Sequence, residues 1–333
     1  MNLHKLFGFS VFALIGAAHA GTSLDSRLQG GNDGWVAYDV AMVEGAGTPC
    51  CFDGDSETST KTCNLDGHNW SFGTRDHQAA PTGPVALSVY LHRQGGKVDR
   101  VRAIASTCSV RADTPVTRLG DTDAAESAQW LQQWIGTHAR HSEVDSALAA
   151  LAYQAGPQAT QALESLSESK APQEQRKNAI FWLGQTRGRD GATIVERFAR
   201  HDGDAEVREH AVFSLSQTKA IDGYAVIHDI ALHDTADHVR SQSLFWMAQT
   251  GDARAPKDIL AAIHSDKDAD VREQGVFALS QLHPGGDTAL IDILRSDAPR
   301  DVKEKAMFWL GQSGSDEAIR FIDQALASTK DGR

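Results

Sequence analysis

Five short segments in the second half of the chain share one pattern of apolar and polar positions. Each has a phenylalanine, an apolar residue two positions later and a glutamine two positions after that. The copies begin at Phe181, Phe213, Phe245, Phe277 and Phe308, at steps of 32, 32, 32 and 31 residues. A near-constant period of this length is typical of repeat architectures, in which each unit buries its apolar face against its neighbours. The pattern therefore predicts a stack of repeats.

One repeat, residues 206–237, shows what each unit contains. Val207 and Leu215 lie on one apolar face of a first helix, and the residues between them widen that face until only a narrow polar strip remains. After a short loop, a second helix carries Tyr224 and Ile227 on its apolar side. Each unit is therefore predicted to be a pair of antiparallel helices.

A sixth, weaker repeat precedes the five. When the chain is shifted by one period of 32 residues, Leu148 aligns with Ile180 and Leu151 with Leu183, so this repeat begins near Val144. Terminal repeats are often atypical because one of their faces meets something other than another repeat. The repeat region is therefore assigned to residues 144–333.

Ahead of the repeats, the hydrophobic pattern changes to a two-residue alternation that predicts strands. The predicted strands cover residues 35–43, 85–92, 98–107 and 115–119, with a turn at Gln94-Gly95-Gly96 between the second and the third. We interpret residues 21–120 as a small antiparallel β domain. A capped helix at residues 124–135 lies within a linking segment, residues 121–143.

The four cysteines, Cys50, Cys51, Cys63 and Cys108, all precede the repeats. An even number of cysteines in an exported chain favours disulfides. Adjacent cysteines rarely pair with each other, so one of Cys50 and Cys51 is expected to join Cys63 and the other Cys108, with the choice left open. The alternative is a reactive or metal-binding group of thiols, but no CxxC spacing supports it.

The first 20 residues have the three parts of a secretory signal peptide. Lys5 supplies the positive charge, residues 6–17 are a run of 12 apolar positions, and Ala18-His19-Ala20 fits the small-x-small cleavage rule. Gly21 would be the first residue of the mature chain. The expected location is the periplasm or the outside of the cell, in soluble form and without a membrane-embedded segment.

The net charge of the chain limits which kinds of partner it can bind. The chain has 32 basic and 44 acidic residues, a net charge of −12, which becomes −13 when Lys5 leaves with the leader. An acidic protein repels phosphate backbones and anionic lipid headgroups, so binding to nucleic acid or to membrane surfaces is not expected.

The boundaries between repeats carry a recurring acid, valine and base. They read Asp204-Ala205-Glu206-Val207-Arg208, Ala236-Asp237-His238-Val239-Arg240, Asp268-Ala269-Asp270-Val271-Arg272 and Arg300-Asp301-Val302-Lys303. Together with the alanines and leucines that follow, these segments resemble HEAT repeats of the phycobilisome-lyase type. The resemblance implies a mainly α protein, a right-handed α-solenoid of about six helical hairpins behind a disulfide-braced antiparallel β domain. It also implies that second helices line a concave surface, which makes Tyr224 and Ile227 the candidate binding residues.

Tryptophans occupy one position in every second repeat. Trp182, Trp246 and Trp309 alternate there with Ser214 and Ala278. They could form an aromatic ladder for a ligand, but packing of large against small residues between repeats is the favoured interpretation.

The recurring glutamines are open to a similar choice. Gln185, Gln217, Gln249, Gln281 and Gln312 either form a surface for a peptide or bond to backbone groups of the next helix, and the second interpretation is favoured. His201, His233 and His264 recur one repeat apart, roughly 10 Å for packed helices, which is too far for a shared metal ion.

No catalytic motif stands out. Gly-x-Ser-x-Gly, HExxH and Walker patterns are absent, and so is the His-Glu dipeptide by which deoxyhypusine hydroxylases bind iron. We therefore expect a non-enzymatic scaffold of the cell envelope that binds a protein partner, with no cofactor and no metal; envelope signalling is a role that the resemblance allows. The rival hypothesis is an enzyme or a small-molecule or metal binder, with its site where the β domain meets the first repeats, near His68, Trp70, His77 and the cysteines.

Overall fold

The computed structural model describes residues 23–29, 31–52, 62–67, 71–74, 85–138, 141–168, 170–282 and 284–331. The predicted leader lies outside these residues, and so do the candidate site residues His68, Trp70 and His77. Within the described residues, no helix is long and apolar enough to cross a membrane.

The N-terminal part is built on a four-stranded sheet in the order β6-β5-β1-β8. Its strands are β1 (Gly34–Ala41), β5 (Ala86–Gln94), β6 (Lys97–Ala105) and β8 (Thr117–Asp121). β5 is antiparallel to both β1 and β6, whereas β8 runs parallel to β1. The sheet is therefore mixed, and the prediction of an antiparallel domain is wrong at this edge. The chain between β6 and β8 crosses over before it pairs, which two-residue alternation in the sequence does not reveal.

Short strands lie in segments for which the sequence pattern predicted none. β2 (Pro49–Phe52) pairs with β4 (Ser71–Thr74), and β3 (Thr62–Asn64) pairs with β7 (Ser109–Arg111). A disulfide joins Cys50 to Cys108, and Cys63 is also disulfide-bonded. The predicted cross-linking of this region is therefore confirmed, and the Cys50–Cys108 bond settles one pairing that the sequence left open. The side chain of Cys51 lies outside the described part of the structure.

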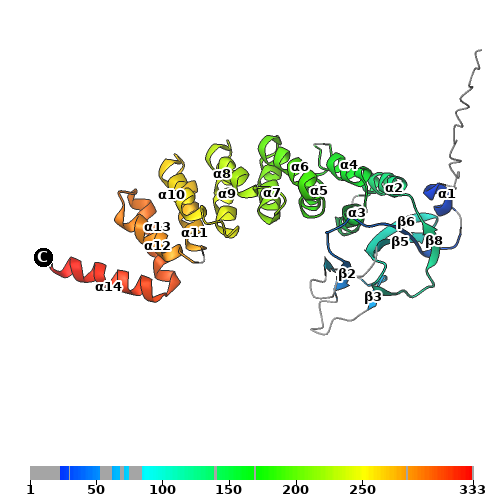
Figure 1. Ribbon diagram of the computed structural model, residues 1–333, viewed down its shortest axis with the longest axis horizontal. Coiled ribbons are helices and arrows are strands. Elements are labelled where there is room, and N and C mark those ends of the chain that lie inside the picture. Colours follow the sequence, from blue (N-terminus) through cyan, green and yellow to red (C-terminus); the bar gives the residue numbers. More distant parts are fainter. Residues whose placement is uncertain are drawn as a thin grey trace, which may run out of the picture.

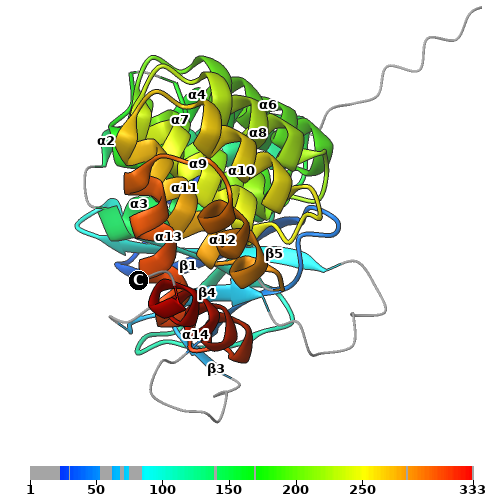
Figure 2. The ribbon, with the colours of Figure 1, turned by 90° about the vertical axis from the view of Figure 1, so that its left-hand side faces the viewer.

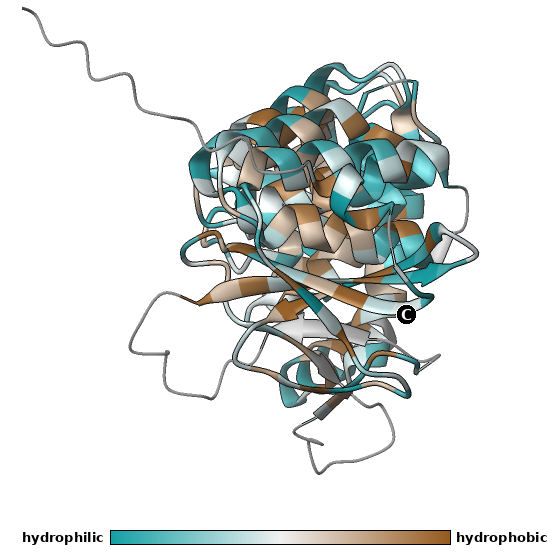
Figure 3. Ribbon diagram, turned by 90° about the vertical axis from the view of Figure 1, so that its right-hand side faces the viewer, coloured by the Kyte–Doolittle hydropathy of each residue, from teal (hydrophilic) through white to brown (hydrophobic). Residues whose placement is uncertain are grey.

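One face of the sheet packs on the first helices of the chain. Val36, Tyr38 and Leu91 belong to this face, and they share a single hydrophobic core with Leu131 and Leu148. These two leucines belong to α2 (Ala124–Thr137) and α3 (His141–Tyr153). The short helix α1 (Leu24–Leu28) also packs against α2. The sheet and the helices thus bury their apolar faces against each other, and Figure 3 shows apolar and hydrophilic segments alternating along both.

Six pairs of helices follow one another within the described residues (Figure 1). The first helices of the pairs are α3, α5 (Gln173–Thr186), α7 (Ala205–Gln217), α9 (Asp237–Gln249), α11 (Ala269–Ser280) and α13 (Arg300–Ser313). The second helices are α4 (Pro157–Leu166), α6 (Gly188–His201), α8 (Gly223–His233), α10 (Ala255–Ser265), α12 (Gly286–Arg295) and α14 (Asp316–Asp331). The pairs confirm the repeat pattern of the sequence. α2 packs against α4 and so continues the row of second helices.

The two rows of helices are not equivalent. Successive first helices contact one another much more extensively than successive second helices do. Figures 1 and 2 show α4, α6, α8 and α10 along one side of the row, and α3, α9 and α11 on the side from which the strands project. The first helices therefore form the more closely packed of the two rows.

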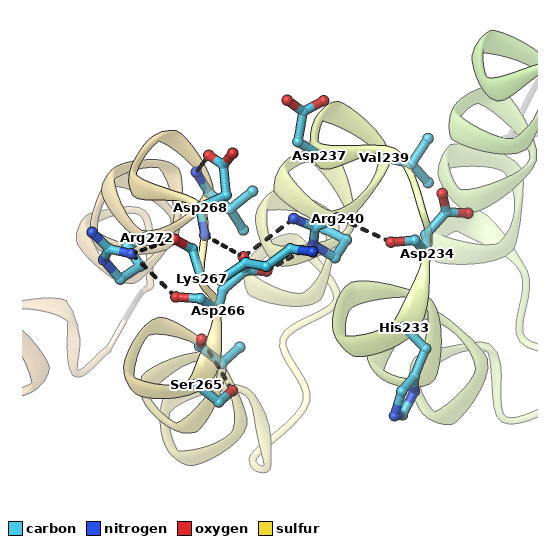
Figure 4. A network of polar contacts seen from close by, with 12 residues as sticks. His233, Asp234, Asp237, Val239, Arg240, Ser265, Asp266, Lys267, Asp268 and Arg272 are labelled. Carbon is cyan, nitrogen blue, oxygen red and sulfur yellow. Dashed lines mark hydrogen bonds and ion pairs between the residues drawn. The ribbon is translucent and has the colours of Figure 1, made fainter.

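Buried ion pairs join successive repeats at the ends of the helices (Figure 4). Arg240 at the start of α9 donates to the carboxylate of Asp266 through Nε at 2.7 Å and Nη2 at 3.2 Å, and through Nη1 to the carbonyl of Asp234 at 2.9 Å. Arg208 makes the equivalent contacts one repeat earlier, with Asp234 and with the carbonyl of Asp202. Each arginine thus links the loop before its own repeat to the loop after it.

The boundary acids also cap helices, as acids ahead of a helix are expected to do. Asp204 accepts a hydrogen bond from the backbone N–H of Glu206 at the start of α7, and Asp268 accepts bonds from Asp270 and Val271 at the start of α11. The recurring acid, valine and base therefore serve the joints between repeats.

Candidate functional site

An unbroken series of aromatic rings runs along the first helices. In order of contact it contains Tyr153, Trp182, Phe181, Phe213, Trp246, Phe245, Phe277, Trp309 and Phe308, with neighbouring ring centroids 4.8 to 6.0 Å apart. We call these nine residues the aromatic ladder. Phe181 and Phe213 are nearly parallel at 6.0 Å, and Phe245 and Phe277 repeat that arrangement. The ladder therefore passes through all six repeats.

The two-repeat alternation of tryptophan follows from the packing. In a repeat with tryptophan, the indole reaches back to an aromatic ring of the preceding repeat, as Trp246 does to Phe213. In the other repeats the corresponding position holds Ser214 or Ala278, and both are fully buried. The tryptophans thus pack between repeats, as the favoured interpretation expected, and the contacts seen there are with other aromatic rings.

The ladder is nevertheless not a closed core. Trp182, Trp246 and Trp309 are partly buried, and so are Phe181, Phe213, Phe245 and Phe277. Phe308 at the end of the ladder is 53% exposed. Packing between repeats and an accessible aromatic surface, which the sequence presented as alternatives, therefore coexist in the same residues.

The recurring glutamines lie on the same side of each first helix, one turn after the phenylalanine. Gln185, Gln217, Gln249 and Gln312 are exposed, and Gln281 is partly buried. Gln217 donates to the hydroxyl of Ser216 at 2.9 Å and Gln281 to that of Ser280 at 3.1 Å. For these two, the favoured interpretation of amides bonded to the next helix is wrong, because each amide bonds to the residue beside it on its own helix. We call the surface formed by the aromatic ladder and these glutamines the aromatic face.

Two depressions lie between successive glutamines of the aromatic face. One, of about 390 Å³, is bounded by Gln217 and Gln249 and by the loops that follow α7 and α9. The other, of about 180 Å³, is lined by Gln281, Trp309 and Gln312. The indole Nε1 of Trp309 is buried without a hydrogen-bond partner. Amide groups beside partly exposed rings can bind a main chain and an apolar side chain at once.

Tyr224 and Ile227, the binding residues expected from the sequence, lie on α8. Ile227 is fully buried, whereas Tyr224 is 6% exposed and lines the depression between Gln217 and Gln249. The Tyr224 hydroxyl donates to Asp258 at 3.0 Å, and Arg254 lies over its ring at 4.4 Å. Burial, together with the hydrogen bond to Asp258, raises the pKa of Tyr224. Ile227 belongs to the hydrophobic core, and the contacts of Tyr224 with Asp258 and Arg254 join α8 to the next repeat.

The junction between the sheet and the first repeats contains an open depression of about 530 Å³. It is lined by Lys97, Val98 and Asp99 of the β5–β6 hairpin and by His138 and Glu143 of the helical part, among others. His138 stacks on Trp134 with ring centroids 3.9 Å apart, and its Nδ1 lies 2.7 Å from the Trp134 carbonyl oxygen. The rival site near His68, Trp70 and His77 falls outside the described residues, and the disulfides leave Cys50, Cys63 and Cys108 without a thiol.

Groups that could hold a metal ion are scarce in the described part of the chain. One cluster there places three potential ligand atoms within 4.8 Å of one another, formed by Glu206, Glu209 and His238. His233 Nδ1 lies 3.0 Å from the Asp229 carboxylate of its own helix, and a histidine in the last turn of a helix is favoured by the helix dipole. His201 and His264 likewise stand in the last turns of α6 and α10, one repeat step away on either side.

Comparisons with known proteins assign no family. No protein-family model matches the chain, and no curated protein matches it. Solved structures that resemble it include Escherichia coli YibA, at 20% identity over 55% of this chain and 68% of that one, with a TM-score of 0.37. Human deoxyhypusine hydroxylase in complex with glycerol matches at 14% identity over 56% and 96%, with a TM-score of 0.27. The complex of CpcE and CpcF of phycocyanin lyase from Nostoc matches at 18% identity over 55% and 97%, with a TM-score of 0.26. Likeness at these TM-scores carries no argument about activity or partner.

Proposed function

We propose that the chain is a non-enzymatic interaction scaffold of the cell envelope, and that its aromatic face binds an extended segment of a partner protein. The six helix pairs would form a HEAT-like, right-handed α-solenoid, and the partner segment would lie along the first helices. The leader-like N-terminus and the disulfides support an exported location, where disulfides persist.

The observation that carries this proposal is the unbroken and partly exposed aromatic ladder. If the rings served only to pack repeats together, they could be fully buried. Here seven rings from five consecutive first helices remain partly accessible beside exposed glutamines. Aromatic side chains supply large contact area with little loss of conformational entropy, and amides bond to a main chain irrespective of its sequence.

The enzymatic alternative has no comparable support. The junction depression contains Lys97, Asp99, His138 and Glu143, but the Nδ1 atom of His138 is engaged with the Trp134 carbonyl. A pair of a nucleophile and its base within hydrogen-bonding reach is the usual requirement for covalent catalysis. In the depression, Thr137 Oγ1 lies 3.1 Å from His138 Nδ1. Both atoms also lie within hydrogen-bonding distance of the Trp134 carbonyl oxygen, at 2.9 and 2.7 Å, so this pair is engaged with its own helix.

The test is a comparative pull-down. Residues 21–333 are used as bait in a periplasmic and envelope extract, beside a ladder variant that carries Phe213→Leu and Trp246→Leu. Leucine keeps apolar filling in the partly buried site but removes the rings. The matched control is Leu232→Ala, a substitution of a 37% exposed residue on the second helix α8.

A protein that the wild type and the Leu232→Ala control both recover, and that the folded ladder variant does not, supports the proposal. Circular dichroism confirms that the ladder variant is folded. Equal recovery by all three baits, or repeated recovery of nothing, contradicts it.

A further inference from the structure

An acidic group lies beside the middle of the aromatic face. Glu206 and Glu209 of α7 and His238 of α9 place their carboxylate and imidazole atoms within 4.8 Å of one another. Glu209 precedes Phe213 by one helical turn and so projects from the same side of α7. Glu206 and His238 are exposed, and Glu209 is partly buried. A ligand that covers Phe213 therefore also meets this group.

Two lysines on this side of the first helices have acidic partners within the chain. Lys177 pairs with Glu174 at 2.5 Å, and Lys305 pairs with Glu273 at 2.8 Å. Within the described part of the chain, Glu206 and Glu209 have no ion pair with a lysine or an arginine. The net charge that the middle of the aromatic face presents to a partner is therefore negative.

The two glutamates also act on each other. Burial and the nearby charge of Glu206 raise the pKa of Glu209, although His238 and Lys177 oppose the shift. A cation bound between the two carboxylates would relieve their repulsion. Its carbon stem could lie on the Phe213 ring, because lysine and arginine cover apolar surface with their methylene groups and are attracted to aromatic faces.

We propose that the segment bound on the aromatic face carries a lysine or an arginine that binds between Glu206 and Glu209. This inference rests on the proposed function and specifies its partner as a basic, extended polypeptide. Complementary charge at the rim of an apolar contact gives specificity and speeds association. The whole chain has a net charge of −12, which also attracts basic partners to the protein.

The experiment starts from a random twelve-residue peptide library displayed on phage, panned on the folded wild-type chain in buffer with EDTA. Clones are then sorted by whether they lose binding to the Phe213→Leu and Trp246→Leu ladder variant. We expect ladder-dependent clones, enriched in lysine and arginine over the unselected library. One such clone is made as a labelled peptide and its affinity is measured by fluorescence anisotropy.

Two variants with the same change in net charge separate a local contact from general electrostatics. Glu206→Gln with Glu209→Gln should weaken binding of the basic peptide by about tenfold or more, as loss of a charge-assisted contact does. Asp292→Asn with Asp323→Asn, on α12 and α14, should change the affinity less than twofold. Replacing the basic residue of the peptide by glutamine should remove the difference between wild type and the Glu206→Gln, Glu209→Gln variant.

Each other outcome overturns a stated part of the account. Ladder-dependent clones without basic enrichment, or an affinity unaffected by the glutamate substitutions, refute the basic partner but leave the proposed function in place. Absence of any ladder-dependent clone refutes both. In a separate titration without EDTA, saturable binding of Zn²⁺ to the wild-type chain that the Glu206→Gln, Glu209→Gln variant loses would show that the Glu206, Glu209 and His238 group holds a metal ion, which also refutes the inference.

Discussion

Replacing Arg240 by methionine tests whether the buried ion pairs hold successive repeats together. Methionine keeps an unbranched apolar stem and removes the guanidinium. The side chains of Arg240 and Asp266 are 8% and 9% exposed, so the substitution leaves the Asp266 carboxylate nearly buried without its cation. It also removes the bond to the Asp234 carbonyl at 2.9 Å.

The expected cost follows from this environment. Removing one partner of a buried pair costs about 3–5 kcal/mol because the remaining charge is uncompensated. We expect about 3 kcal/mol, the lower end of that range, because the Asp266 carboxylate keeps a hydrogen bond of 2.9 Å from the backbone N–H of Asp268. The matched control is Arg300→Met on α13, whose pair with Glu304 is 92% and 64% exposed. Exposed pairs of this kind contribute about 0.5 kcal/mol or less.

The assay is urea denaturation at 25 °C followed by circular dichroism, with hydrogen exchange to locate the loss, because repeat arrays can unfold in parts. The exchange rates should rise around α9, α10 and α11. Adding Asp266→Asn to Arg240→Met should recover part of the stability, since it removes the unpaired charge. If Arg240→Met costs no more than Arg300→Met, the ion pairs do not stabilise the joints and the reasoning is refuted.

The same pair predicts how pH alters this cost. Burial raises the pKa of Asp266, but the hydrogen bonds from Arg240 and from the Asp268 N–H and the charge of Arg240 outweigh burial, so its pKa lies below the usual value. A lowered pKa in the folded state gives stabilisation that is complete above the unfolded pKa, about 3.9, and is lost as pH falls through the folded value. The difference in unfolding free energy between wild type and Arg240→Met should therefore narrow below about pH 4. A difference that stays constant from pH 7 to pH 3 would contradict this assignment.

Three further substitutions probe other parts of the fold by thermal or urea unfolding. Trp246→Ala should cost about 2 kcal/mol, because the indole is only partly buried, and a cost near zero would show that the ladder does not support the packing. Gly275→Ala should cost about 1–3 kcal/mol of unfolding free energy, because a Cβ there would lie 2.5 Å from Ile263 Cγ1, between α11 and α10. An unchanged midpoint of thermal unfolding would mean that the Ile263 side chain moves aside without cost. Cys108→Ala removes the disulfide to Cys50, which spans 58 residues, and should cost about 4 kcal/mol of unfolding free energy from chain entropy. Hydrogen exchange should become faster in the sheet but not in α9 to α13, and a uniform increase would be inconsistent with a local brace.

The repeats were predictable because each one repeats the same physical requirement. A first helix packed on three sides needs apolar residues at fixed intervals, and the recurring Phe, Leu and Gln show that interval directly. The strands β1, β5 and β6 followed from alternation in the same way. The strand expected at residues 115–119 overlaps β8, but its parallel direction was missed, because strand direction depends on how the chain crosses over and not on which residues alternate.

The residues of the proposed site were visible in the sequence, but their arrangement was not. The sequence identified the recurring tryptophans and glutamines, and it predicted a binding surface on the second helices, at Tyr224 and Ile227. Which rings stay partly exposed depends on the spacing between repeats, and that spacing results from contacts such as that of Phe213 with Trp246 at 4.8 Å. The two-repeat alternation of tryptophan was the available signal, because it shows that rings of neighbouring repeats meet.

Crosslinking from the two sides of the helix row tests the central claim most directly. A photoreactive phenylalanine derivative is incorporated at Gln249 on the aromatic face or at Leu232 on the second helix α8, both exposed positions. After illumination with the partner recovered in the pull-down, the account predicts a covalent adduct from position 249 and none from position 232. An adduct from position 232 alone, or equal adducts from both positions, would show that the aromatic face is not the binding surface.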